Sequence, residues 1–324
     1  MPYYLYKLKF PYGVHFGADK SGVSLEKTAP NCHCDTFYSA LCHEILKLHG
    51  EEELSKFYNE TVDGEFLFSD LLPYKNDDLM IPKPILFIEK NENEKINDSV
   101  KKKKMKKLQF IPILKLKDFF NGNIEAIDFC KTAIYEKNAP SRDGDDTKNG
   151  LYSVSVTRFF ENCGLYFIVK IEKSKKDWFD NILKSLSYSG LGGKRTSGYG
   201  QFEIINDFEL EANSRIENKA ICEFSKLLNI HSEYYLSLSA FYPKKNEIQK
   251  LKTGYYTLIQ RQGFVQSSTY SNTLLKKIPI TMVNAGSCFK EKFIGDIIDV
   301  HKGGNHPVYR YGKPIMIGID VCNN

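Results

Sequence analysis

Apolar and polar residues alternate between residues 3 and 10, and this period of two predicts an opening strand. The turn signal Pro11-Tyr12-Gly13 ends that strand. A helix is expected next, because apolar residues then recur every three or four positions, at Phe37, Leu41, Ile45 and Leu48. Asp35 is placed to cap this helix and Gly50 to end it, and a second short helix is expected at 51–58.

Further strands and a helix complete the first half. Clusters of β-branched and aromatic residues predict strands at 152–160 and 165–171. A helix at about 175–187 and a strand at 201–208 follow, the helix carrying Trp178, Ile182 and Leu186 on one face. The region 89–157, with an expected helix at 124–135, reads as an insertion. The element order is that of a ferredoxin-like fold with embellished loops.

The second half is richer in strand patterns. Extended stretches are expected at 234–242, 255–260, 264–267, 278–283 and 315–321, with a helix near 220–228. We therefore expect an α+β protein with two ferredoxin-like (RRM-like) domains in tandem, at 1–208 and 209–324, and long loop insertions in the first. The second copy would be degraded, since no internal repeat is visible.

Length and composition agree with a folded protein of two domains. The chain has 324 residues, of which 42% are hydrophobic and 26% charged, and this balance excludes a wholly disordered chain. No apolar stretch reaches the ~20 residues that a membrane span needs. Lysines interrupt the first ten residues, where a secretory signal needs a continuous apolar segment. The expected location is the cytoplasm, with no membrane association.

No metal and no cofactor are expected. The eight cysteines are too sparse for a disulfide scaffold. Cys32-His33-Cys34, followed by Cys42 and His43, is a zinc candidate, but no second ligand pair stands at zinc-site spacing, and the alternative is a helix entrance. Residues 143–146 (Asp-Gly-Asp-Asp) are similar to the metal motif of palm-domain cyclases, but its first glycine is absent and the flanks are loop-like.

Positive charge is unevenly distributed. The net charge is only +5, yet residues 101–107 hold six lysines in seven positions. Such a run is either a site for a polyanion or a solvated loop, and the sequence leaves both open.

The segment 190–200 (Gly-Leu-Gly-Gly-Lys-Arg-Thr-Ser-Gly-Tyr-Gly) carries the strongest chemical signal. Exposed amides, two hydroxyls and two cations are together the donors that phosphate oxygens require. The loop follows a helix and enters a strand, which excludes a Rossmann fingerprint. Tyr188 and Arg195 occupy positions where a Walker loop needs glycine and a hydroxyl residue. The alternative to a polyphosphate site is a plain glycine turn.

This helix, glycine loop and strand resemble the signature of the RAMP superfamily of CRISPR RNA-binding proteins. Further segments occur in the order of one RAMP family, that of the fourth subunit of the Csm (type III-A CRISPR) complex: Asp35-Thr36-Phe37, Phe68 to Pro73, Pro82-Lys83-Pro84, Phe110-Ile111-Pro112, Gly164-Leu165-Tyr166, Gly263-Phe264-Val265, Ala285-Gly286-Ser287 and His306 to Gly312. The resemblance implies a noncatalytic subunit, one copy per hetero-oligomeric complex, that caps the 5′ repeat-derived handle of the crRNA. It also implies contact with the large polymerase-like subunit and with the backbone RAMP subunit.

The expected RNA contacts centre on the glycine loop. Lys194 and Arg195 would meet phosphates, and Tyr199 would stack on a base or sugar. The loop amides and hydroxyls would fix the path of the strand, from Gly190, Gly192, Gly193, Thr196, Ser197 and Gly198. Tyr12, His15 and Phe16 either join this edge or pack the first turn. Arg261 belongs to an aromatic and basic cluster with Tyr255, Tyr256 and Phe264 that fits RNA or a partner protein.

An enzymatic alternative remains, because some RAMP relatives cleave RNA. His15 would then act as general base of a metal-independent endoribonuclease in crRNA maturation, with Tyr12 and Lys194 in acid and electrostatic roles. A purely protein-binding scaffold is the third possibility.

Overall fold

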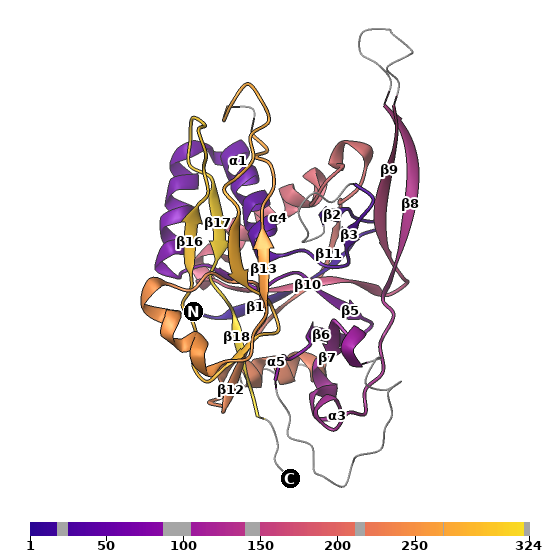
Figure 1. The fold of residues 1–324 in the computed structure, drawn as a ribbon, viewed down its shortest axis with the longest axis vertical. Coiled ribbons are helices and arrows are strands. Elements are labelled where there is room, and N and C mark those ends of the chain that lie inside the picture. The colour runs from indigo at the N-terminus through magenta and orange to yellow at the C-terminus, as the bar shows by residue number, and fades with distance from the viewer. Residues whose placement is uncertain (18–24, 87–104, 140–149, 211–217, 268, 321–324) are drawn as a thin grey trace.

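The computed structural model describes residues 1–17, 25–86, 105–139, 150–210, 218–267 and 269–320. Its largest sheet runs in the order β11-β1-β10-β5-β6-β7, and a further strand, β4, pairs with β10 (Figure 1). All the pairings in it are antiparallel. The strands are β1 (Tyr3–Lys9), β4 (Leu67–Phe68), β5 (Leu72–Lys75), β6 (Asp78–Pro82), β7 (Phe110–Pro112), β10 (Cys163–Lys170) and β11 (Glu203–Glu209).

Two helices cover one face of this sheet. α1 (Cys34–Asp63) and α4 (Lys176–Ser189) bury their apolar side chains against Tyr4, Tyr6 and Leu8 of β1. The expected break at Gly50 is present, as a non-helical residue (φ 85°, ψ −172°) inside one long helix. The expected cap is wrong. α1 begins at Cys34, so Asp35 lies in the first turn.

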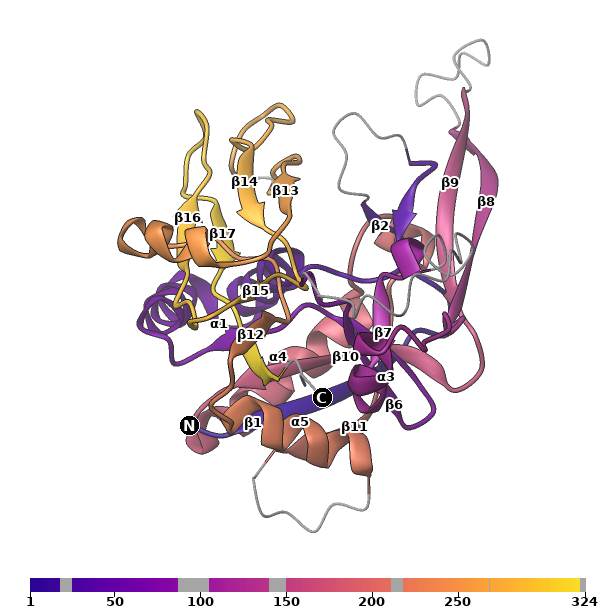
Figure 2. The same cartoon turned by 60° about the horizontal axis from the view of Figure 1, so that its bottom comes forward.

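The opposite face is covered by a helix from the second half. α5 (Lys219–Asn229) is capped by Asn218, whose side chain accepts hydrogen bonds from the amides of Ala220 and Ile221. The Phe224 ring packs edge-on against Tyr166 of β10, at 5.7 Å between centroids. Figure 2 shows α5 on one side of β1 and β10 and α1 on the other. The central sheet is therefore buried on both faces, and the two halves share a core.

The second half is β-rich, as expected, but its strands form small sheets. One sheet has the order β15-β12-β18, and two ribbons pair β13 with β14 and β16 with β17. The β16–β17 ribbon packs on α1, since Tyr309 stacks on Tyr58 with ring centroids 3.8 Å apart. The elements are β12 (Tyr234–Ser237), η6 (Lys245–Thr253), β13 (Leu258–Arg261), β14 (Ile280–Val283), β15 (Cys288–Phe289), β16 (Asp296–Asp299), β17 (Tyr309–Gly312) and β18 (Met316–Ile319).

The helix expected at 124–135 is wrong. Residues from Cys130 onward form β8 (Cys130–Ala139), which pairs along its whole length with β9 (Gly150–Phe159) in a long hairpin. Local spacing suggested a helix, but cross-strand pairing with a distant segment decides the outcome. The region 89–157 is also not wholly an insertion outside the core, because β7 extends the central sheet beside β6. It further contains η2 (Ile113–Lys115) and α3 (Leu116–Phe120).

Two short strands, β2 (Phe16–Gly17) and β3 (Thr28–Ala29), pair near the base of the hairpin. Residues 101–104 of the lysine run and the Asp-Gly-Asp-Asp segment lie outside the described residues. None of the helices in the described ranges is long and apolar enough to cross a membrane.

Candidate nucleic-acid interface

The glycine loop connects α4 to β11 through a series of left-handed backbone conformations. Gly190, Gly192, Gly198 and Gly200 all have φ between 79° and 95°, a region that L side chains rarely adopt. Lys194 adopts a positive φ of 58° as well. The loop closes on itself, since the Leu191 amide donates to the Gly200 carbonyl at 2.8 Å.

The loop lies directly on the turn that follows β1. The Gly193 amide donates to the His15 carbonyl at 2.8 Å, and the Gly200 amide donates to the Gly13 carbonyl at 3.0 Å. A Cβ at Gly192 would lie 2.7 Å from the His15 carbonyl oxygen. Glycine is therefore required there for close approach as well as for φ.

Most loop amides are not donors for a ligand, which corrects the sequence-based expectation. The Gly190 amide donates to Leu186 in α4, and the Gly193 amide is held by His15. In the short turn η5 (Arg195–Ser197), the amides of Ser197 and Gly198 donate to Lys194 and Arg195. The loop thus presents its side chains rather than a row of free amides.

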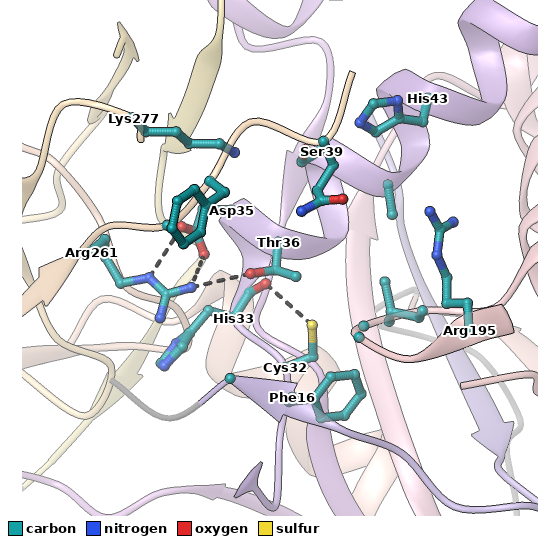
Figure 3. Close-up of a pocket in the computed structure, with 18 of the residues that line it drawn as sticks. Phe16, Cys32, His33, Asp35, Thr36, Ser39, His43, Arg195, Arg261 and Lys277 are labelled. Atoms are coloured by element: carbon teal, nitrogen blue, oxygen red, sulfur yellow. Dashed lines mark hydrogen bonds and ion pairs between the residues drawn. The ribbon is translucent and has the colours of Figure 1, made fainter. Parts of the chain in front are cut away.

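These side chains face a cleft of about 520 Å³ between the glycine loop, the start of α1 and the second half (Figure 3). Among the described residues that line it, five carry a cationic side chain and one, Asp35, carries a carboxylate. The cations come from distant parts of the chain: Lys194, Arg195, Arg261, Lys277 and Arg310. Such a surplus attracts a polyanion, and a groove concentrates the field.

Asp35 binds two of these arginines from the floor of the cleft. Arg261 makes a two-point contact, with Nε 3.1 Å from Oδ2 and Nη2 2.8 Å from Oδ1, and Nη2 also donates to Thr36 at 3.1 Å. Arg310 donates through Nη1 to the same carboxylate. Burial alone would raise the pKa of the Asp35 carboxyl, but the two guanidinium groups outweigh it and hold that pKa below its ordinary value. We call Asp35, Arg261 and Arg310 the arginine clamp.

Two further titratable groups face the cleft. Burial and the charge of Arg310 lower the pKa of Lys277 to about 8. Burial and the charge of Arg195 also lower the pKa of His43, which makes it a neutral imidazole at physiological pH. The cleft therefore carries one amine whose charge responds to pH just above neutrality.

The structure brings most of the predicted site residues together. Those that line the cleft are Phe16, Gly190, Gly192, Gly193, Lys194, Arg195, Thr196 and Arg261. Arg261 lines the cleft, where Asp35 holds it, and Phe264 lines the same cleft. The cluster proposed around Arg261 is thus divided, because Tyr255 and Tyr256 are not part of this lining.

Several predicted contacts do not line the cleft: Ser197, Gly198, Tyr199, Tyr12 and His15. Tyr199 holds the Lys137 ammonium of β8 over its ring at 4.6 Å, so it faces the hairpin. His15 is only 6% exposed, and its Nδ1 lies 2.7 Å from the Ser155 carbonyl oxygen. Tyr12 is 60% exposed, at the surface.

Sequence reasoning missed Lys277, Arg310, His43 and the role of Asp35. Asp35 and Arg310 stand within segments that carry the family resemblance, which was the available signal. Lys277 and His43 stand in no such segment. Their common role depends on contacts between residues that are far apart in the chain.

Two residues of the sequence-based metal candidate contact other groups of the protein. The Cys34 thiol contacts the Ala240 carbonyl, and the His33 Nδ1 lies 2.8 Å from Asp70 Oδ2. Across the described ranges, no group of three His, Cys, Asp or Glu side chains is arranged to hold a metal ion.

Comparison with known proteins places the chain in a family. Residues 231–319 match the family model described as the CRISPR Csm4 C-terminal domain. The CRISPR system protein Csm4 of Mycobacterium tuberculosis (strain H37Rv) is 31% identical over 311 residues, which cover 94% of each chain. The chain belongs to the Csm4 family. A Csm4 of Streptococcus thermophilus is 30% identical over 332 residues, covering 99% of this chain and all of that protein.

Solved structures show the same fold. The Csm3-Csm4 subcomplex of a type III-A CRISPR-Cas interference complex matches with a TM-score of 0.62 at 21% identity, covering 98% of this chain and 99% of that chain. A Csm1-Csm4 cassette in complex with pppApA matches with a TM-score of 0.61 at 17% identity over the whole of both chains. The cationic cleft is therefore a feature of a Csm4-family chain, a RAMP-type CRISPR subunit.

Proposed function

We propose that this Csm4-family chain is a noncatalytic RNA-binding subunit of a type III-A CRISPR effector complex. It holds the 5′ repeat-derived handle of the crRNA in the cleft beside the glycine loop. One observation carries this proposal: the fold brings five cationic side chains from distant segments around a single groove with one buried carboxylate. A phosphate backbone is the ligand whose charge such a groove balances.

Among the cations that line the cleft, two are fixed by Asp35 and two lie on the glycine loop. Arg195 is exposed on η5 and Lys194 is half-buried beside it, so both reach a strand that lies in the cleft. Arg261 and Arg310 are fixed by Asp35, which leaves them less free to move when a phosphate approaches. A pre-ordered guanidinium loses less side-chain entropy on binding than a mobile one.

The assembly follows by analogy with the relatives. The Csm3-Csm4 subcomplex and the Csm1-Csm4 cassette make Csm3-type and Csm1-type subunits the expected partners. These correspond to the backbone RAMP subunit and the large polymerase-like subunit. One copy of this chain per complex is part of the proposal. The strand order β11-β1-β10-β5, with α1 and α4 on one face, supports a ferredoxin-like first domain. A second such domain at 209–324 stays a prediction.

The endoribonuclease alternative is less well supported. A general base must reach the proton that it removes, but His15 is buried, its ring is hydrogen-bonded to Ser155, and it does not line the cleft. Incubation of the purified protein with labelled repeat RNA in EDTA separates the two functions. We expect retention without cleavage. A discrete product that His15→Ala abolishes would establish the enzyme instead.

The test of RNA placement is the salt dependence of guide binding. We expect Lys194→Ala with Arg195→Ala, in the reconstituted complex, to weaken guide loading and to reduce the slope of log K against log[salt] by about 1.4, at ~0.7 per phosphate contact to a single strand. Lys219→Ala with Lys226→Ala removes the same charge from exposed positions on α5 and serves as control. A slope that the loop variant leaves at the control value would place the RNA elsewhere.

A further inference from the structure

A second recess, of about 390 Å³, opens beside the cleft, and we call it the side recess. It shares Asn31 and His33 with the cleft, so the two cavities are neighbours with a common wall. Its other walls come from four parts of the chain: residues 28–30, Asp70 with Leu72, the segments Pro82-Lys83, Ile85 and 108–110, and Asn284 with Ala285 in the second half. The volume lies within the ~300–1,000 Å³ range of small-molecule sites.

Backbone hydrogen bonds fix these walls in place. The Lys83 amide donates to the Gln109 carbonyl at 2.9 Å, which joins the segment after β6 to the segment before β7. The Ile85 amide donates to the Gly286 carbonyl at 2.8 Å, which joins the segment after β6 to the second half. The side recess is therefore pre-formed, and a ligand need not order it on binding.

The charged groups of the side recess are already engaged. Both Asp70 oxygens are used, one by His33 Nδ1 at 2.8 Å and the other by the Cys34 amide at 2.9 Å. The Lys83 ammonium donates to the Met105 carbonyl at 3.2 Å. The described lining of the side recess thus has one lysine and no arginine, against five such cations in the cleft.

What the side recess offers is neutral hydrogen-bonding capacity and a flat apolar surface. The side-chain amides of Asn31 and Gln109 make no hydrogen bond to any residue that the structure describes. Asn284 uses its Oδ1 to accept from the Ala285 amide, which leaves its NH₂ group for a ligand. The half-buried Phe110 ring supplies an aromatic wall. Amide groups beside an aromatic ring recognise the edge and the face of a nucleobase.

We propose that the side recess receives one nucleobase turned out of the RNA strand that lies in the cleft. The amides of Asn31, Gln109 and Asn284 contact the edge of that base, and Phe110 contacts its face. This inference rests on the proposed function. It adds a base-reading site to a cleft whose cations bind phosphates regardless of sequence.

The test uses the reconstituted complex and a series of guide RNAs, each with one abasic nucleotide in the handle. With the wild-type chain, removal of the base at one position should weaken binding by about five- to a hundredfold. Asn31→Ala with Gln109→Ala should weaken binding of the intact guide by a similar factor and abolish the penalty at that position alone. Gln249→Ala, an exposed amide residue outside both cavities, is the matched control.

The salt slope distinguishes the two proposals. The amide variant should keep the wild-type slope, since no phosphate contact is lost. If the loop variant lowers the slope but no abasic position responds to the amide substitutions, the side recess proposal is wrong while the proposed function stands. If the loop variant keeps the control slope, the RNA does not lie in the cleft and both proposals fail. Matching thermal unfolding of all variants excludes misfolding. Gln109→Ala alone, at an exposed residue, repeats the binding measurement with a single substitution.

Discussion

The Lys194 ammonium lies 4.4 Å from the centroid of the Tyr152 ring, so the glycine loop and β9 are joined by a cation–π contact. A second cation–π contact has its lysine on the hairpin instead: the Lys137 ammonium of β8 lies 4.6 Å from the ring centroid of Tyr199 in the loop. The glycine loop is thus joined to the long hairpin by two cation–π pairs, one with its lysine on the loop and one with its lysine on the hairpin.

The first prediction concerns this contact. In a double-mutant cycle on the free energy of unfolding, Lys194→Ala and Tyr152→Leu should show a coupling of ~0.5–1 kcal/mol, because a half-exposed cation–π pair contributes about that much. In guide binding the two should differ: Lys194→Ala lowers the salt slope by about 0.7, while Tyr152→Leu keeps the charge and hence the slope. Additive unfolding energies would show that the two residues do not interact in solution.

A second prediction tests why glycine is required in the loop. Gly192 and Gly198 both have positive φ, of 95° and 84°, but only at Gly192 would a Cβ meet other atoms. Both Gly192→Ala and Gly198→Ala should cost ~1–2 kcal/mol through backbone strain. Gly192→Ala should lower the free energy of unfolding by more than Gly198→Ala does, because its Cβ displaces the loop from the His15 carbonyl. Gly192→Ala should also reduce guide affinity. Equal losses of stability and affinity in the two variants would count against the close-approach argument.

A third prediction follows from the arginine clamp. Asp35→Asn should destabilise the chain by ~3–5 kcal/mol in urea unfolding, because it leaves the buried guanidinium groups of Arg261 and Arg310 without their carboxylate. Arg310→Met added to Asp35→Asn should recover part of this loss. A double variant as unstable as the sum of the two single variants would argue that the three residues do not act as a unit.

The clamp also predicts how stability changes in acid. The folded-state pKa of Asp35 lies below its ordinary value of 3.8, so the stability from its ionised form is present above that pH and declines as the pH falls below it. Asp35→Asn should remove this part of the acid dependence. Urea midpoints measured between pH 2 and pH 6 give the comparison, and curves for the two proteins that stay parallel below pH 3.8 would be the contrary result.

A fourth prediction concerns the pH dependence of guide binding. Lys277 has its pKa lowered to about 8 by burial and by Arg310, so the free cleft loses this charge as the pH rises through 8. A bound phosphate favours the charged amine, and affinity should fall by up to about tenfold between pH 7 and pH 9. Lys277→Met should bind more weakly at pH 7 and show a flatter profile. A wild-type profile that does not change over this interval would exclude the contact.

Local pattern determined a large part of this protein. The alternation in β1, the helical repeats of α1 and α4, the break at Gly50 and the glycine turns after α4 all depend on neighbours along the chain. Periodicity and glycine content report such features directly. The strand expected at 152–160 is present as β9, but its partner β8 was missed, because pairing with a distant strand and not local spacing determines it.

Only the tertiary structure decided the site itself. Arg261 and Arg310 reach Asp35 across 226 and 275 positions of sequence, and no local window contains that contact. The same folding turned Tyr199 toward the hairpin and used several loop amides internally, which the loop sequence alone did not reveal. Residue types set which groups can bind a phosphate, but burial and long-range packing decide which of them face the ligand.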